Sequence, residues 1–314
     1  AGITAVGKGA LDANTTASNS TAIGVDALGA NTTGDENTAV GSNALLTITT
    51  GGASTAVGRN ALKLATGGDN TAVGSNALAA NSTGATNTAV GATALDANTT
   101  ASNNSALGYA ALGANTTGHS NAAVGKDALQ SNTTGVSNTA VGANSLELNT
   151  TTSYNTAVGR GALSANVADS NTAVGQGSMA ANTSGANGSA LGYASLAANT
   201  TGQQNTGLGT SALAANTTGG YNTAVGYGAL DANTTADNNT AVGRGALGAN
   251  TTAANNAAVG YAALGANTTG TFNVAVGSLS LDANTDGQQN TGVGYHALSA
   301  NTTGGSVTAF GSLA

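Results

Sequence analysis

The 314-residue sequence contains no cysteine, no proline and no tryptophan, and only 3% of its residues are aromatic and 6% charged. The absence of cysteine excludes disulfides, thiolate metal sites and cysteine nucleophiles. Six Lys and Arg residues stand against 13 Asp and Glu residues, so the net charge is −7. This acidic balance argues against nucleic acid as a partner. No apolar run approaches the roughly 18 residues of a membrane span, so we expect no membrane insertion.

What the sequence does contain is one short repeat. The tetrad Thr-Ala-Val-Gly, or a close variant of it, occurs 19 times, with sixteen intervals of 17 residues and two of 16. The ideal unit reads NTAVGxxALxANTTGxx. No insertion, linker or shift in composition interrupts the series, so residues 1–314 are predicted to form a single repeat domain, with no internal boundary and no recognisable caps.

A unit of 17 residues is too short for a helical-hairpin repeat and fits one coil of a β-solenoid. We expect two short strands per coil, TAV and ALxAN, separated by turn-forming Gly-x-x and NTTGxx. Successive coils would stack in parallel at about 4.8 Å. The predicted fold class is therefore all-β, a β-solenoid or β-roll of about 18 coils.

Equivalent residues of successive coils should form columns, and the columns predict burial. The Val position holds only Val, Ile, Leu or Phe, and the Leu position is Leu or, once, Met179. We expect both to fill the interior of the coil. The Ala between Thr and Val should face the other way, where it admits no more than a methyl group. This pattern predicts an oligomer interface along the Ala column, with a monomer whose TAV face meets solvent as the alternative; representative members are Ala39, Ala89, Ala140, Ala224 and Ala275.

The segment NTAVGYGALDANTTA at 222–236 resembles the YadA-like β-roll head repeats of trimeric autotransporter adhesins and the related shaft repeats of bacteriophage tail fibres. The resemblance extends along the whole chain, although NTTGxx is a longer corner than those repeats have. It implies a parallel homotrimer of left-handed β-rolls. It leaves open whether the chain belongs to an adhesin or to a phage fibre.

The position after each tetrad Gly collects most of the bulky and basic side chains. Planar rings and guanidinium groups there could stack on sugars, which makes this column a candidate glycan-contact stripe. The alternatives are an exposed corner that tolerates bulk, or a protomer interface. The candidate residues are Arg59, Tyr109, Lys126, Arg160, Tyr193, Tyr227, Arg244, Tyr261 and Tyr295.

Acidic and histidine residues form no recognisable catalytic or metal-binding pattern. Asp12 and Asp96 share the position after Leu but lie five repeats apart, so we interpret them as solubilising charges. The adjacent pair Asp35 and Glu36 lacks the context of a calcium loop. We therefore predict no enzyme activity, no metal site and no cofactor.

Asparagine recurs in the corner as part of Asn-x-Ser/Thr, which makes Asn14, Asn31, Asn98 and Asn115 candidates for glycosylation. We prefer a ladder of stacked amides that are hydrogen-bonded from coil to coil. The paired Thr beside them suggests an ice-binding array, although only one Thr of each pair could project outward.

These observations predict a structural protein, a rigid trimeric shaft of an extracellular fibre or adhesin, located at a cell surface or on a virion. Its partners would be copies of itself and a host surface or cell-surface glycans. Because repeat proteins need polar caps, and none is recognisable here, a filament of stacked coils is the main alternative. The ice-binding Thr array is a second alternative.

Overall fold

The computed structural model describes residues 2–314, which form 19 three-residue strands and no helix. The protein is thus an all-β parallel β-solenoid of about 18 turns with a repeat of about 17 residues. The chain divides into two compact units, Ala1–Asn155 and Thr156–Ala314. Residues 2–314 contain no helix, and therefore no helix that is long and apolar enough to cross a membrane.

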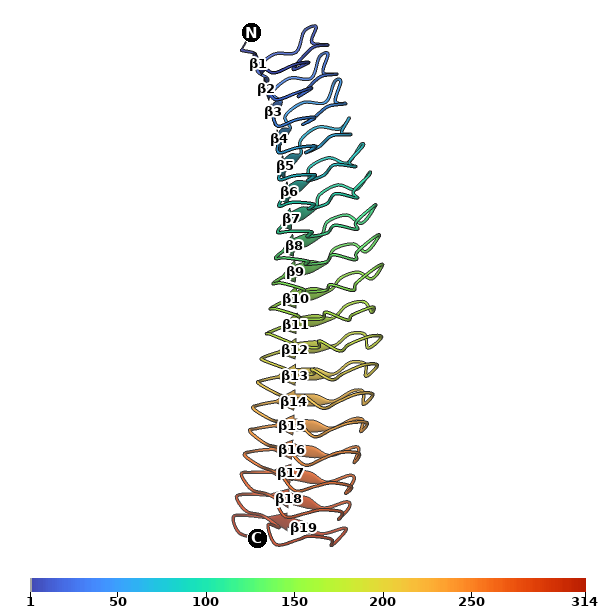
Figure 1. The fold of residues 1–314 in the computed structure, drawn as a ribbon. Helices are drawn as coiled ribbons and strands as arrows, with labels where there is room; N and C mark the ends of the chain where they lie inside the picture. The colour runs from blue at the N-terminus through green and yellow to red at the C-terminus, as the bar shows by residue number, and fades with distance from the viewer. Residues whose placement is uncertain (1) are drawn as a thin grey trace. The chain divides into compact units, whose positions relative to one another are not determined.

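The two units contain the same coil, with one strand in each turn (Figure 1). The first unit contains β1 (Thr4–Val6), β2 (Thr21–Ile23), β3 (Thr38–Val40), β4 (Thr55–Val57), β5 (Thr71–Val73), β6 (Thr88–Val90), β7 (Ser105–Leu107), β8 (Ala122–Val124) and β9 (Thr139–Val141). The second contains β10 (Thr156–Val158), β11 (Thr172–Val174), β12 (Ser189–Leu191), β13 (Thr206–Leu208), β14 (Thr223–Val225), β15 (Thr240–Val242), β16 (Ala257–Val259), β17 (Val274–Val276), β18 (Thr291–Val293) and β19 (Thr308–Phe310).

Neighbouring strands within each unit pair in parallel and in register, so identical residues of successive coils stack on one another. Between β3 and β4, for example, Thr38 pairs with Thr55 and Ala39 with Ala56. The register is the same across the shorter 16-residue interval, where Thr55 pairs with Thr71. The missing residue is lost from the NTTGxx corner, which therefore absorbs the change in length without moving the strands.

The tetrad glycine ends each strand for two physical reasons. Gly41 has a φ of 141°, which L side chains rarely adopt. A Cβ atom on Gly41 would also lie 2.4 Å from the carbonyl oxygen of Gly58 in the next coil. The stacking of backbone on backbone therefore requires glycine at this position in each coil.

The second predicted strand, ALxAN, is wrong, because this segment forms turns. Its Leu residues adopt the left-handed conformation, with a φ of 51° at Leu45, and this interrupts an extended strand. Hydrogen bonds between coils continue nonetheless, since the Leu45 amide donates to the Ala61 carbonyl at 3.1 Å. The sequence thus indicated the coil-to-coil bonding of this segment but not its local conformation.

The predicted orientation of the strand is also wrong. The Leu column fills the interior as expected, but the central Ala of each strand faces inward beside it and the Val faces outward. The five alanines proposed for an oligomer interface, Ala39, Ala89, Ala140, Ala224 and Ala275, have 0% exposure within the chain. In the coil of β3, Ala39, Ala44 and Leu45 are fully buried, whereas Val40 is half-buried, so Leu and two Ala side chains fill the interior in place of Val.

Candidate functional site

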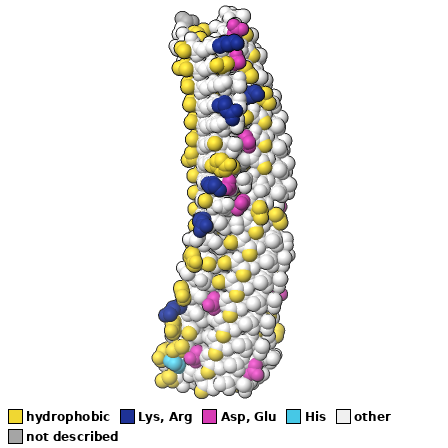
Figure 2. All heavy atoms as spheres, in the orientation of Figure 1, with side chains coloured by type: hydrophobic (Ala, Val, Ile, Leu, Met, Phe, Trp, Pro, Cys, Tyr) yellow, Lys and Arg dark blue, Asp and Glu magenta, His cyan; other side chains and the backbone are white. Residues whose placement is uncertain are grey.

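An aliphatic column is the main exposed feature of the strands. From β2 to β18, the first and third residues of each strand are exposed or half-buried, while the central residue is buried. The third residue is always Val, Ile or Leu in these strands, and none is buried. Leu107 and Leu191, for example, remain 50% and 49% exposed. Figure 2 shows hydrophobic side chains that continue from coil to coil, with Lys and Arg side chains next to them.

We call this set of third strand residues the aliphatic column. Burying large apolar side chains stabilises a protein by about 1.5–3 kcal/mol each. A repeated aliphatic position that a single chain leaves exposed therefore indicates a surface for association. This surface, and not the buried Ala column, is the structure's candidate interface.

The predicted glycan-contact residues lie directly after the tetrad glycines, and all nine are exposed: Arg59, Tyr109, Lys126, Arg160, Tyr193, Tyr227, Arg244, Tyr261 and Tyr295. The structure brings only some of them together. Because these positions lie one coil apart, contact requires a ring and a cation on adjacent coils. Four of the nine make no cation–π contact within residues 2–314: Arg59, Arg160, Tyr193 and Tyr295. The Tyr295 ring instead lies edge-on to the His296 ring.

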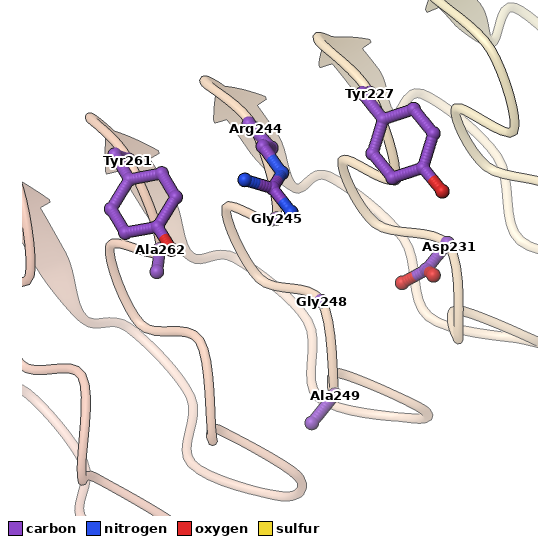
Figure 3. Close-up of a pocket in the computed structure, with 9 residues that line it drawn as sticks. Tyr227, Asp231, Arg244, Gly245, Gly248, Ala249, Tyr261 and Ala262 are labelled. Carbon is purple, nitrogen blue, oxygen red and sulfur yellow. The ribbon is translucent and has the colours of Figure 1, made fainter.

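The largest of these groups is a stack of three side chains from successive coils. The Arg244 guanidinium lies 5.9 Å from the ring centroid of Tyr227 and 5.7 Å from that of Tyr261. Figure 3 shows the three side chains in a row beside the turns of their coils. In the first unit, Lys126 lies 6.0 Å from the Tyr109 ring centroid and also forms an ion pair with Asp127.

A hollow of about 410 Å³ adjoins this stack. Its lining includes Asp231 and three residues without side chains, Gly228, Gly245 and Gly248. A Cβ atom on Gly248 would lie 3.6 Å from Asp231 Oδ1, so the glycine leaves the carboxylate uncovered. The repeat pattern by itself indicated no site role for Asp231 or Gly248. The signal that could have identified them is an Asp after Leu followed one repeat later by Gly at the same position.

The same Asp-then-Gly register occurs twice in the first unit, and each occurrence forms a hollow. Asp96 and Gly113 line one of about 530 Å³ together with Tyr109, and here a Cβ atom on Gly113 would lie 3.7 Å from Asp96 Oδ1. Asp12 and Gly29 line another of about 320 Å³, in which no tyrosine takes part. Asp12 and Asp96, which we interpreted as isolated solubilising charges, thus occupy repeated surface hollows.

Partial burial affects the acids in two of these hollows. Desolvation raises the pKa of Asp231 and of Asp96 above the usual value, and hydrogen bonds from backbone amides oppose this effect. Within residues 2–314, no ion pair joins Asp231 or Asp96 to a Lys or Arg side chain, so neither carboxylate is neutralised by a salt bridge. Both carboxylates therefore remain available as hydrogen-bond acceptors beside a tyrosine ring.

The corner asparagines form the predicted amide ladder. Asn98 Nδ2 donates to Asn81 Oδ1 at 2.8 Å and to the Ala101 carbonyl at 3.0 Å, and Asn115 Nδ2 donates to Asn98 Oδ1 at 3.0 Å. The Asn of each NTAV segment forms a second column, in which Asn87 Nδ2 donates to the same Ala101 carbonyl at 2.8 Å. Two asparagine columns therefore hold one corner through shared acceptors.

This ladder bears on the glycosylation candidates. Asn31, Asn98 and Asn115 have 0% exposure, and Asn14 is half-buried. Both amide hydrogens of Asn98 are used in hydrogen bonds, so a sugar on Nδ2 would break the ladder. The folded coil thus favours the ladder as the role of these asparagines.

The paired threonines divide into two roles. Thr32 Oγ1 donates to the Thr49 carbonyl of the next coil at 3.0 Å, while Thr33 is exposed. In most coils that contain the pair, only the second Thr is exposed, although Thr49 and Thr50 are both exposed. The exposed threonines therefore form the narrower of the two arrays considered for ice binding in most of these coils.

Of the adjacent acids Asp35 and Glu36, Asp35 bonds to the corner of the preceding coil. The Ser18 amide and hydroxyl both donate to Asp35 Oδ1, at 2.6 and 3.0 Å, and these bonds lower the pKa of Asp35. Within residues 2–314, no three His, Asp or Glu side chains cluster as a metal site would require.

Comparison with known proteins gives no further assignment. No family model matches the chain, and no curated protein sequence matches it.

Proposed function

We propose that the chain is the shaft of an extracellular fibre or adhesin, in which three copies associate in parallel through their aliphatic columns. The observation that carries the proposal is that the aliphatic side chain at the end of each strand from β2 to β18 is exposed or half-buried, and none is buried. Such a column in water costs free energy that association would recover.

The periodicity of the column favours a second copy of this chain as its partner. From β2 to β18, each strand presents Val, Ile or Leu in the same register. A partner that covers this column must therefore repeat at the spacing of stacked strands, about 4.8 Å. A parallel copy has that spacing along its own column. Self-association around an axis would therefore bury the part of the column that lies in each unit, with closed symmetry.

The number three and the extracellular location follow from the resemblance of NTAVGYGALDANTTA to trimeric adhesin and phage-fibre repeats. In this proposal the chain has no catalytic role, and it spaces or displays an attachment function. The Tyr, Arg and Lys side chains that follow some of the tetrad glycines would remain on the surface, where they could contact a host.

Light scattering combined with negative-stain electron microscopy tests the proposal. The expected result is a uniform rod with a mass of about 88 kDa, three times the 29.3 kDa of one chain. Replacing Val141 and Val242 by Lys places charges in the aliphatic column and should give monomers.

The control for those variants is Thr134→Lys, which adds the same charge on an exposed corner residue outside the column. It should remain trimeric. A wild-type monomer would contradict the shaft. A mass that rises steadily with protein concentration would replace it with the filament, and inhibition of ice recrystallisation by a monomer would favour the Thr array.

A further inference from the structure

We propose that the hollow beside Tyr227, Asp231, Arg244, Gly248 and Tyr261 binds a neutral hexopyranose unit of a surface glycan. The inference rests on the proposed function for its context, since a shaft at a cell or virion surface meets glycans. It goes further in assigning a discrete site and a sugar class, where the sequence indicated only a stripe.

The shape of the hollow is the first argument. Its volume of about 410 Å³ lies within the usual range for small-molecule sites, about 300–1,000 Å³. Gly245 and Gly248 line one side of the hollow, its floor, and have no side chains there. A flat ligand could therefore approach the backbone. Figure 3 shows Asp231 beside this floor, on the turn next to Tyr227.

The chemistry of the lining is the second argument. Tyrosine rings offer an apolar face for the C–H face of a pyranose and a hydroxyl at the edge. The Arg244 guanidinium, held between the rings of Tyr227 and Tyr261, offers donors to sugar oxygens. The Asp231 carboxylate is an acceptor for sugar hydroxyls. Asp231 and Arg244 both line the hollow, so its negative and positive charges offset each other, which favours a neutral sugar.

Recurrence of the arrangement is the third argument. The hollow of Asp96 and Gly113 has the same register and also includes a tyrosine, Tyr109. Burial raises the pKa of both Asp96 and Asp231, so each hollow keeps a partly desolvated carboxylate that gains from a hydroxyl partner. The hollow of Asp12 and Gly29 lacks a tyrosine and provides a comparison within the same chain.

Saturation-transfer NMR tests the site with the methyl glycosides of glucose, galactose, mannose and N-acetylglucosamine as probes. At least one should bind. Filling both tyrosine-containing hollows, with Gly113→Gln and Gly248→Gln together, should weaken binding about tenfold. Gln is compatible with this position, since Gln130 occupies it in another coil. The matched control Gly29→Gln fills the hollow without tyrosine and should leave binding unchanged.

Substituting Tyr227 and Tyr261 by Ala in the Gly113→Gln background should have the same effect as filling both hollows. Binding of none of the four glycosides would overturn the inference. So would binding that survives the double Gln variant, or stronger binding of glucuronic or sialic acid. The mass of each variant separates this result from the proposed function. A trimer that binds no sugar contradicts the site alone, whereas a monomer that binds sugar contradicts the shaft alone.

Discussion

At the scale of single residues, exceptions within the repeat are paired across the interior of the coil. Gly207 replaces the central strand Ala, and a Cβ atom there would lie 2.5 Å from Ser195 Oγ. Gly292 and Ser280 repeat the arrangement at 2.8 Å. Each serine donates to the carbonyl of its glycine at 2.9 Å. The serine thus occupies the space that the alanine methyl group fills in other coils.

Met179 and Gly188 show the same compensation. Met179 replaces the interior Leu, and its Cε atom lies 2.6 Å from where a Cβ atom of Gly188 would be. Gly188 stands where most coils have the Asn of NTAV. The longer side chain therefore requires the smaller neighbour.

Gly207→Ala should destabilise the coil by about 1 kcal/mol, because Ser195 must then give up the Gly207 carbonyl for another acceptor, as Ser145 does in a coil that has Ala at this position. Combining it with Ser195→Ala should restore most of the stability, since it recreates the Ala pair of other coils, such as Ala44 and Ala56. Chemical denaturation of the two single variants and the double variant measures this coupling. If the losses simply add, the two residues do not share the space that the structure assigns to them.

The partly desolvated carboxylates give a pH-dependent prediction. Burial raises the pKa of Asp231, so its charged form costs stability that the protonated form does not. This cost is absent below about pH 3.8 and is complete once the pH exceeds the raised pKa. Asp231→Asn should therefore raise Tm at pH 7 and leave it nearly unchanged at pH 3. Calorimetry at both values provides the check, and a gain that is larger at pH 3 would contradict the assigned cause.

Residue patterns predicted which positions are apolar, but not which way each one faces. Ala and Val of each TAV strand face opposite sides, and the pattern is the same whichever of the two points into the coil. The larger residue, Val, was expected inside. Two left-handed residues, at the second position after Gly and at Leu, shape the turn that brings Leu into the interior. Sequence alone does not show that this Leu takes the space Val would need.

At the scale of elements, the corner depends on its asparagine columns. Asn115 Nδ2 donates to Asn98 Oδ1 and to the Gly118 carbonyl at 2.9 Å, while Asn115 Oδ1 accepts from Asn132 at 2.9 Å. The residue is buried, so each group relies on these partners. The ladder was predicted from the repetition of Asn, whereas the second column and the acceptor it shares with the first were not.

Asn115→Asp should destabilise the first unit by more than about 2 kcal/mol, because it removes both donors and places a charge beside two acceptor oxygens. Asn115→Ile should cost less, since Ile48 occupies this column in another coil. Thermal unfolding followed by circular dichroism compares the two variants. The cost of the Asp variant should also shrink as the pH falls, because protonation restores one donor. Equal, pH-independent losses would argue against the ladder.

At the scale of the whole molecule, the repeat alone predicted the parallel solenoid, because only a stacked coil accommodates a 17-residue period with a glycine at every turn. It could not predict the exposed surface, since that depends on the direction of the strand side chains. The repeat did not predict the hollows either, because each is formed by residues that lie one repeat apart in the sequence. Handedness and the number of chains are properties that the resemblance implies and the repeat itself does not encode.

The central claim is that the aliphatic column lies against copies of the same chain. Because the sequence contains no cysteine, a single Val141→Cys substitution introduces the sole thiol, and Thr134→Cys provides a matched thiol on the exposed corner. Non-reducing electrophoresis after mild oxidation at low protein concentration is the direct measurement. The account predicts that Val141→Cys forms a covalent dimer, with two of three chains linked, while Thr134→Cys stays monomeric. Equal crosslinking of the two variants, or none at Val141→Cys, would contradict it.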